Sequence, residues 1–339
     1  MARPALLDRL VPVPPVVVRR LAIAAVIAQA GIAVTGSIVR VTGSGLGCPT
    51  WPQCFPGSLV PTQHPEVAAL HQWVEFGNRL LTFAVVAVTG LCFLAALSTG
   101  RPRLVRLALV QPLGVVAQAV IGGFTVLLGL VWWSVSVHFL VSMALVWLAV
   151  VLVSAVTEGD GPPAPVVPRA VRALVGTSTA VLGALLLAGT FVTAAGPHSG
   201  DADTPRLAAG VPAMAQLHAD LLFGYLGLLV GLGFALRAVS APAGLLRRYA
   251  VLVAAVLLQG VVGGVQYALG VPEALASLHV LGAALVTVAA AAVWTGTAQR
   301  GPVESPPTPP RPGDATLAEP PPGAPSPDVA DQPALAERS

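Results

Sequence analysis

Long apolar runs separated by short polar segments fill most of the chain up to residue 297. Eight of these runs have roughly 20 residues or more, the length that an α-helix needs to cross the hydrocarbon core of a bilayer. They cover residues 20–39, 72–98, 104–129, 131–155, 170–195, 214–237, 246–269 and 274–297. The pattern therefore predicts an all-α, polytopic membrane protein with eight transmembrane helices. Because the turns near Gly129 and Gly270 are very short, each should join antiparallel neighbours.

Part of the sequence occurs twice. The segment AQAVIGGFTVLLG, with the glycine pair 122–123, recurs 141 residues later as LQGVVGGVQYALG, with the pair 263–264. A second match pairs HQWVEFG with HADLLFG at an offset of 147 residues. The glycine pairs leave space either for a close approach of neighbouring helices or for a flat macrocycle. The repeat predicts two pseudo-symmetric four-helix bundles, at residues 20–155 and 170–297.

The segments outside the two bundles are predicted to lie in the cytoplasm. They are an N-terminal segment at 1–19, a linker at 156–169 and a proline-rich tail at 298–339, whose composition is typical of disorder. Thirteen arginines flank the helices on one side, whereas Arg40 and Arg206 alone lie on the other. Since positive loops stay inside, both termini should be cytoplasmic. No small-residue cleavage site follows the first helix, which we therefore interpret as an anchor.

The composition limits the partners. Hydrophobic residues make up 55% of the chain and charged residues only 10%, against about 25% charged in soluble domains. The lipid bilayer is thus the expected surrounding. No clustered basic stripe with aromatic residues indicates nucleic-acid binding. Arginine has replaced lysine entirely, and alanine, glycine, proline and valine dominate, which favours a high-GC bacterium and its plasma membrane.

Four histidines, one in each even-numbered apolar segment, are the candidate metal ligands: His71, His138, His218 and His279. Each lies near the start of its segment, so the topology predicts a similar depth for all four, near the outer face. A polar side chain inside a bilayer is costly and usually functional, although a single histidine is more often a core residue. Two imidazoles from facing helices can ligate a heme iron. Zinc is less favoured, because no local cluster of His, Cys and carboxylate supplies four ligands.

Glu75 is the carboxylate that we single out within the spans. It lies four residues after His71 on the same helix face, and Asn78 lies on that face too. A carboxylate there could accept a proton or orient a histidine ring. The alternative is a salt bridge with Arg79, or a place in the headgroup region. We favour a functional Glu75.

Two loops on the outer side carry the remaining candidates. Cys48 and Cys54 lie in VTGSGLGCPTWPQCFPG, and a disulfide is the natural interpretation in an oxidising compartment. A dithiol that passes electrons, or two thiols that never meet, are the alternatives. The loop of the second half, VTAAGPHSGDAD, carries His198 and Asp201. These residues could approach the edge of a cofactor, or could form an ordinary polar turn.

Together these motifs resemble heme A synthase. The resemblance rests on GSIVRVTGSGLGCPTWPQC, the EFGNR element, the histidine that opens the fourth helix, and the GPHSGD turn, and it covers roughly residues 20–297. It implies a heme b held by His218 and His279 in the C-terminal half. The N-terminal half would receive the substrate heme O with His138 as one ligand. The acidic residue of the family's second helix corresponds to Glu75, and its cysteine pair to Cys48 and Cys54.

One position departs from the resemblance. Many members of the family have histidine directly before the arginine of the EFGNR element, where this chain has Asn78. His71 matches His218 in the HxxxxFG repeat and lies two turns before Asn78 on the same face. We therefore hypothesise that His71 is the second ligand of the N-terminal heme.

The resemblance implies a reaction and its partners. The C8 methyl of heme O would be oxidised to the formyl group of heme A, with Glu75 as proton acceptor. A heme O synthase would deliver the substrate, and cytochrome oxidase assembly factors would take the product. An alternative is a b-type heme electron-transfer subunit, although such subunits place two histidines on one helix. A transporter built from repeats is a third interpretation, but the polar residues do not gather at the midplane.

Overall fold

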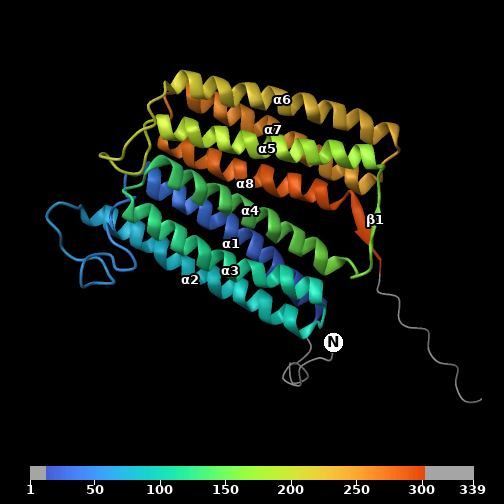
Figure 1. The fold of residues 1–339 in the computed structure, drawn as a ribbon, viewed down its shortest axis with the longest axis horizontal. Helices are drawn as coiled ribbons and strands as arrows, with labels where there is room; N and C mark the ends of the chain where they lie inside the picture. Colours follow the sequence, from blue (N-terminus) through green and yellow to red (C-terminus); the bar gives the residue numbers. More distant parts are fainter. Residues whose placement is uncertain (1–12, 302–339) are drawn as a thin grey trace, which may run out of the picture. The chain divides into compact units, whose positions relative to one another are not determined.

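The eight predicted helices are present. A computed structural model describes residues 13–301 of the chain (Figure 1). The helices are α1 Pro15–Val41, α2 Ala69–Ser98, α3 Pro102–Leu127, α4 Trp132–Thr157, α5 Arg169–Ala195, α6 Val211–Ala238, α7 Ala243–Ala268 and α8 Glu273–Thr295. All eight are long and apolar enough to cross a membrane. Most of the predicted N-terminal segment and tail, at 1–12 and 302–339, lies outside the described residues.

The helix boundaries follow local chemistry. α1 begins at Pro15, five residues before the predicted start, because proline is well tolerated in the first turn of a helix. The turns that end α3 and α7 share one backbone conformation. Gly129 and Leu130 have φ of 66° and 57°, and their repeat partners Gly270 and Val271 have 75° and 63°. The internal repeat is therefore present in the backbone as well as in the sequence.

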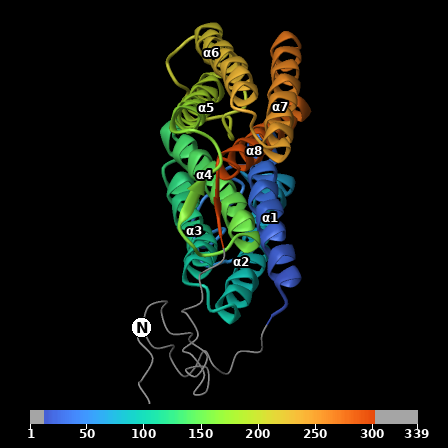
Figure 2. The same cartoon turned by 90° about the vertical axis from the view of Figure 1, so that its right-hand side faces the viewer.

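The helices pack in two groups of four (Figure 2). In the N-terminal group, α1 to α4 form a closed ring in which every helix packs against two neighbours. In the C-terminal group, α5 packs on α6 and α7 on α8, whereas α6 and α7 make little contact with each other. α8 joins the groups by packing on α1 and α4, where Met143, Val146 and Ala284 are fully buried or nearly so.

A short antiparallel ribbon, which the sequence did not predict, lies at one end of the bundle. Strand β1, Pro163–Pro165, belongs to the linker between the halves and pairs with β2, Ala298–Arg300, which follows α8. Arg101 fastens this end, because its guanidinium pairs with Asp160 and donates to the carbonyl oxygen of Ala155. We call this the ribbon end of the bundle. The opposite end, where the Cys48–Cys54 loop connects α1 to α2, is the disulfide end.

Candidate functional site

His218 and His279 face each other inside the C-terminal group. Their ring centroids are 6.3 Å apart and their planes meet at 62°. The Nδ1 atom of His218 lies 3.1 Å from the carbonyl oxygen of Leu185. A carbonyl oxygen can only accept, so Nδ1 carries the proton and Nε2 keeps its lone pair for a ligand. Such a bond also fixes the orientation of the imidazole, as it does for metal-bound histidines.

Each candidate histidine of α4, α6 and α8 packs on a glycine of the preceding helix. A Cβ atom at Gly263 would lie 2.9 Å from Cε1 of His279, and one at Gly122 would lie 3.2 Å from Cε1 of His138. Gly189 of α5 stands in the same relation to His218, at 3.1 Å. The first glycine of each repeated pair therefore makes room for a histidine ring.

The helix that carries each ring is held in the same way in both halves. Gln118 donates to the carbonyl oxygen of His138 at 2.9 Å, and Gln259 donates to that of His279 at 2.8 Å. The Nδ1 atoms of both histidines are buried and have no hydrogen-bond partner within the described part of the chain. A buried polar atom without a partner is costly, so the two rings are suited to a ligand that the protein itself does not provide.

Asn78 of α2 lies near a glycine of the preceding helix, as His218 of α6 does. A Cβ atom at Gly36 of α1 would lie 4.0 Å from Nδ2 of Asn78, just as Gly189 faces His218. Thr35 donates a 2.7 Å hydrogen bond to Oδ1 of Asn78. The N-terminal group thus holds an amide side chain near a glycine of its first helix, where the C-terminal group holds the imidazole of His218 against Gly189.

His71 lies closer to its helix end than the other three candidates. It sits in the first turn of α2, with Nδ1 2.9 Å from the hydroxyl of Ser44, whereas His138, His218 and His279 lie about two turns into their helices. Aligned on the HxxxxFG repeat, α2 therefore begins later than α6, and the similar depth expected for the four histidines stays a prediction. The role of His71 as a heme ligand also stays a prediction.

The C-terminal pair passes a simple test for an iron porphyrin. Two metal–imidazole bonds of about 2 Å each, extended to the ring centres, separate two axial rings by roughly 6 Å, close to the 6.3 Å between His218 and His279. Over residues 13–301, no three His, Cys, Asp or Glu side chains gather as a metal-binding group. The residues present therefore fit a metal that brings its own equatorial ligands.

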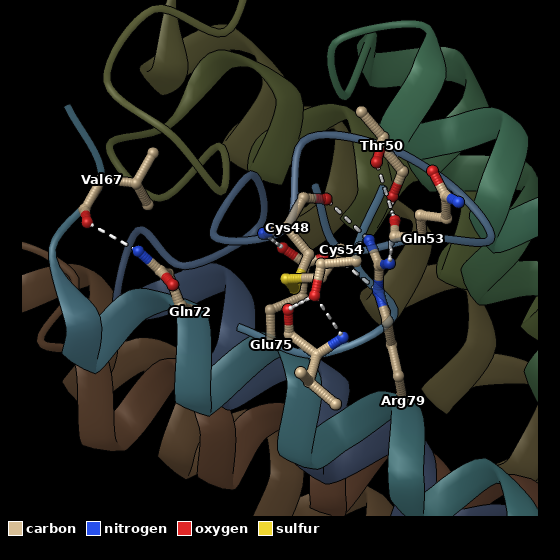
Figure 3. Close-up of a disulfide and its surroundings, with 10 residues drawn as sticks. Cys48, Thr50, Gln53, Cys54, Val67, Gln72, Glu75 and Arg79 are labelled. Carbon is tan, nitrogen blue, oxygen red and sulfur yellow. Dashed lines mark hydrogen bonds and ion pairs between the residues drawn. A yellow bond between two sulfur atoms is a disulfide. The ribbon is translucent and has the colours of Figure 1, made fainter. Parts of the chain in front are cut away.

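The predicted disulfide between Cys48 and Cys54 is confirmed. Both cysteines are fully buried, and the loop between them is fastened to α2 (Figure 3). Glu75 accepts a 2.7 Å hydrogen bond from the backbone of Cys48, and its other oxygen pairs with Arg79 at 2.6 Å. Arg79 also donates to the carbonyl oxygens of Cys48, Thr50 and Gln53.

Glu75 is therefore buried, and both of its carboxylate oxygens have partners. It is 5% exposed, and the salt bridge with Arg79, which the sequence left as an alternative, is formed. The ion pair anchors the disulfide loop whatever else the carboxylate does. A role in proton transfer remains a prediction, to be tested separately from this anchoring.

Trp51, at the centre of the same loop, was missed by the sequence reasoning. A Cβ atom at Gly123 of α3 would lie 2.4 Å from the Trp51 ring, whereas its repeat partner Gly264 has nothing within 4 Å. The loop therefore covers a part of the N-terminal group that has no cover in the C-terminal group. The available signal was a large aromatic residue placed between two cysteines.

The second loop at the disulfide end contains His198 and Asp201. The Nε2 atom of His198 lies 2.7 Å from the carbonyl oxygen of Val271, in the turn between α7 and α8. One carboxylate oxygen of Asp201 accepts from the backbone of Asp203. The backbone of Gly45 donates to Gly200 at 2.8 Å, so the loops of the two halves meet here.

The fold and these residues define a duplicated eight-helix membrane protein with histidine sites inside its helix groups. Comparison with known families agrees. The chain matches the family described as cytochrome oxidase assembly protein over residues 19–293, and it belongs to that family.

Curated relatives carry the name heme A synthase. The chain is 35% identical to the protein of Lysinibacillus sphaericus (strain C3-41) over 137 residues, which are 39% of this chain and 42% of the relative. It is 31% identical to that of Shouchella clausii (strain KSM-K16) over 155 residues, covering 42% and 48%. A shorter match of 52 residues, at 38% identity, links it to Geobacillus thermodenitrificans and covers 15% and 14%. Each match spans less than half of the relative's length.

Proposed function

We propose that this protein is a heme A synthase, an oxidoreductase that converts the C8 methyl group of heme O to a formyl group. The observation that carries the proposal is the facing pair His218 and His279, at the separation that two axial ligands of one iron require. Family membership and the names of the relatives support it. The duplicated Gly–His packing in the other half supplies a second site for the substrate.

The two halves would then have different tasks. His218 and His279 would hold a resident heme b, which would supply one-electron transfer. His138 binds the substrate heme O in the N-terminal half, with His71 as the second candidate ligand. Gly122, like its counterparts, lets the histidine ring take its place without strain.

Glu75 is our candidate for the proton acceptor. Its carboxylate lies on α2, three residues before Asn78 and below the disulfide loop (Figure 3). Oxidation of a methyl group releases protons, and a buried carboxylate that is tied to a loop at the disulfide end offers a short route outward. Arg79 and the backbone of Cys48 position the carboxylate.

The membrane arrangement and the partners are part of the proposal. The excess of arginine on one side supports cytoplasmic termini and a disulfide end that faces outward from the plasma membrane, where a disulfide is stable. A heme O synthase would supply the substrate. Cytochrome oxidase assembly factors would receive the product.

Expression in a host that makes heme O but no heme A tests the function. Heme A should appear in the extracted pigment with the wild-type chain and be absent with His138→Ala. If the purified protein carries b-type heme and no heme A forms, the electron-transfer alternative is correct. A protein without pigment would contradict both.

Two variants separate the chemistry of Glu75 from its anchoring of the loop. Glu75→Gln should keep the bound heme and lose heme A formation. Arg79→Gln breaks the same ion pair but leaves the carboxylate in place, so it should retain part of the activity. Equal losses in the two variants would mean that Glu75 acts only as an anchor.

A further inference from the structure

Two arginines at the disulfide end converge on one cavity. The cavity has a volume of about 290 Å³ and is lined by Arg40, at the end of α1, and by Arg206, in the loop before α6. The rest of its wall is the loop segment 197–202 and the residues that follow Arg40. These are the two arginines that the charge distribution leaves on the side opposite to the other thirteen.

Neither guanidinium has a carboxylate partner. Within residues 13–301 the salt bridges join Arg79 to Glu75, Arg101 to Asp160 and Arg103 to Glu158. Arg206 donates to the carbonyl oxygen of Gly196, and the side chain of Arg40 donates to no group in the described part of the chain. Arg40 is half-buried, and an unpaired guanidinium next to a bilayer is costly, whereas Arg206 is exposed at the rim of the same cavity.

The other polar groups of the wall do not neutralise the arginines. Asp201 is the one carboxylate among the lining residues, and within residues 13–301 no ion pair joins it to either arginine. Two arginines against one carboxylate leave a net positive charge. The imidazole of His198 is held by the carbonyl oxygen of Val271. The cavity therefore keeps a positive charge that an anion would complement.

The position of the cavity indicates which anion fits. Most of its wall belongs to the loop that leads into α6, and His218 lies about two turns into that helix. At a rise of 1.5 Å per residue, this is roughly 10 Å below the loop. A heme carries its two carboxylates on one edge of the ring, so a ring held below the loop can direct that edge toward the cavity.

We propose that Arg40 and Arg206 bind the propionate carboxylates of the heme held by His218 and His279. The inference rests on the proposed heme function and adds a binding site to it. Guanidinium groups match carboxylates with paired hydrogen bonds. One arginine comes from each half of the chain, so the bound heme would also tie the N-terminal group to the C-terminal group.

The test compares heme with its dimethyl ester, in which both carboxylates are neutral. Full-length protein with His138→Ala, which leaves the C-terminal pair as the binding site, is purified without heme and titrated while the Soret absorbance is followed. Binding of the free acid should be at least about tenfold tighter than that of the ester, as expected for charged hydrogen bonds. Arg40→Gln and Arg206→Gln should each reduce this preference severalfold.

Control variants show whether the reduced preference is specific to Arg40 and Arg206. Arg106→Gln removes an arginine that lies in α3 near the ribbon end and should leave the preference unchanged. Arg40→Lys keeps the positive charge and should retain part of the preference for the free acid over the ester. A general loss of folding would weaken the acid and the ester alike, so the ratio between them reports the carboxylate contact alone.

The outcomes separate the two proposals. If neither compound gives a Soret complex, the heme function itself is wrong. If both bind equally to the parent protein, or if Arg40→Gln and Arg206→Gln keep the full preference, the propionate site is wrong and the heme function stands.

Discussion

The two halves of the molecule share a helix plan but differ in how they surround their histidines. In the N-terminal group, four helices close a ring, Trp51 covers Gly123, and Asn78 lies near a glycine of α1. In the C-terminal group, α6 and α7 stand apart, Gly264 faces open space, and two imidazoles meet. Duplication has therefore preserved the packing of His138 and His279 while the opposite side of each site has changed.

The difference matches the two tasks that we propose. Two facing imidazoles suit a cofactor that stays bound, whereas the substrate of the other half must arrive and leave. The cover over the N-terminal group, held by a disulfide and an ion pair, would restrict the access of water to the site where chemistry takes place. Four experiments can break or sharpen this comparison.

The largest expected effect comes from removing one histidine in each half. His279→Ala should lower the affinity for resident heme b by more than about 100-fold, since even the loss of an outer partner of a metal ligand costs 10–100-fold. His138→Ala should keep heme b and abolish heme A formation. Pyridine hemochrome spectra of the purified variants measure how much heme b each protein contains. His64→Ala, in the exposed loop beside Phe55, is the control. Equal loss of heme b in both variants would contradict the division of tasks.

The disulfide should contribute the next largest effect. Replacing Cys48 and Cys54 by alanine opens a loop with a sequence separation of 6, for which the chain-entropy model gives about 2 kcal/mol of unfolding free energy. The melting temperature in detergent should fall accordingly. Dithiothreitol should lower the melting temperature of the wild type and leave that of the double variant unchanged. A wild type that is insensitive to reduction would show that the bridge does not stabilise the fold.

A single methyl group tests the packing of the histidine in the C-terminal half. Gly263→Ala would place Cβ 2.9 Å from His279, whereas Gly264→Ala meets nothing within 4 Å. We expect about a tenfold weaker binding of heme b in the first variant, or roughly 1.4 kcal/mol, and no change in the second. Heme titration of the two purified proteins provides the measurement. Equal affinities would mean that the ring moves aside freely.

Asn78→His should cause the smallest change in heme affinity. It is also the most direct comparison of the N-terminal group with the C-terminal group. This variant should give the N-terminal group a facing pair like that of the C-terminal group and shift its heme spectrum to that of two axial imidazoles. Electron paramagnetic resonance of protein loaded with heme O reports the change, with Asn78→Gln as the control. If the wild-type spectrum already shows two imidazoles and His71→Ala removes them, His71 is the second ligand.

The periodic features of the sequence predicted the fold well. Apolar runs predicted the eight helices, and the internal repeat predicted the two groups of four, whose turns agree in their backbone angles at Leu130 and Val271. The ribbon of β1 and β2 escaped detection because three-residue strands have no periodic pattern. Its pairing joins segments that lie more than a hundred residues apart.

The sequence predicted only part of the candidate site. The pairing of His218 and His279 was implied by the resemblance to heme A synthase, and the bond of Cys48 to Cys54 was inferred from the compartment. The HxxxxFG match sets His71 against His218, whereas Asn78 shares with His218 the approach to a glycine of the preceding helix. A short motif does not reveal where each helix begins: His71 lies in the first turn of α2, whereas His218 lies about two turns into α6. The contact of Trp51 with α3 depends on the path of an irregular loop, which no local pattern specifies.

The ribbon has a consequence for how the chain is assembled. Because β1 precedes α5 and β2 follows α8, the segments at the two ends of the second half are hydrogen-bonded to each other. Such a segment, with adjoining ends, is the kind that tolerates transplantation or expression as a separate fragment. The C-terminal half therefore begins and ends at one point, in addition to its packing against the N-terminal half through α8.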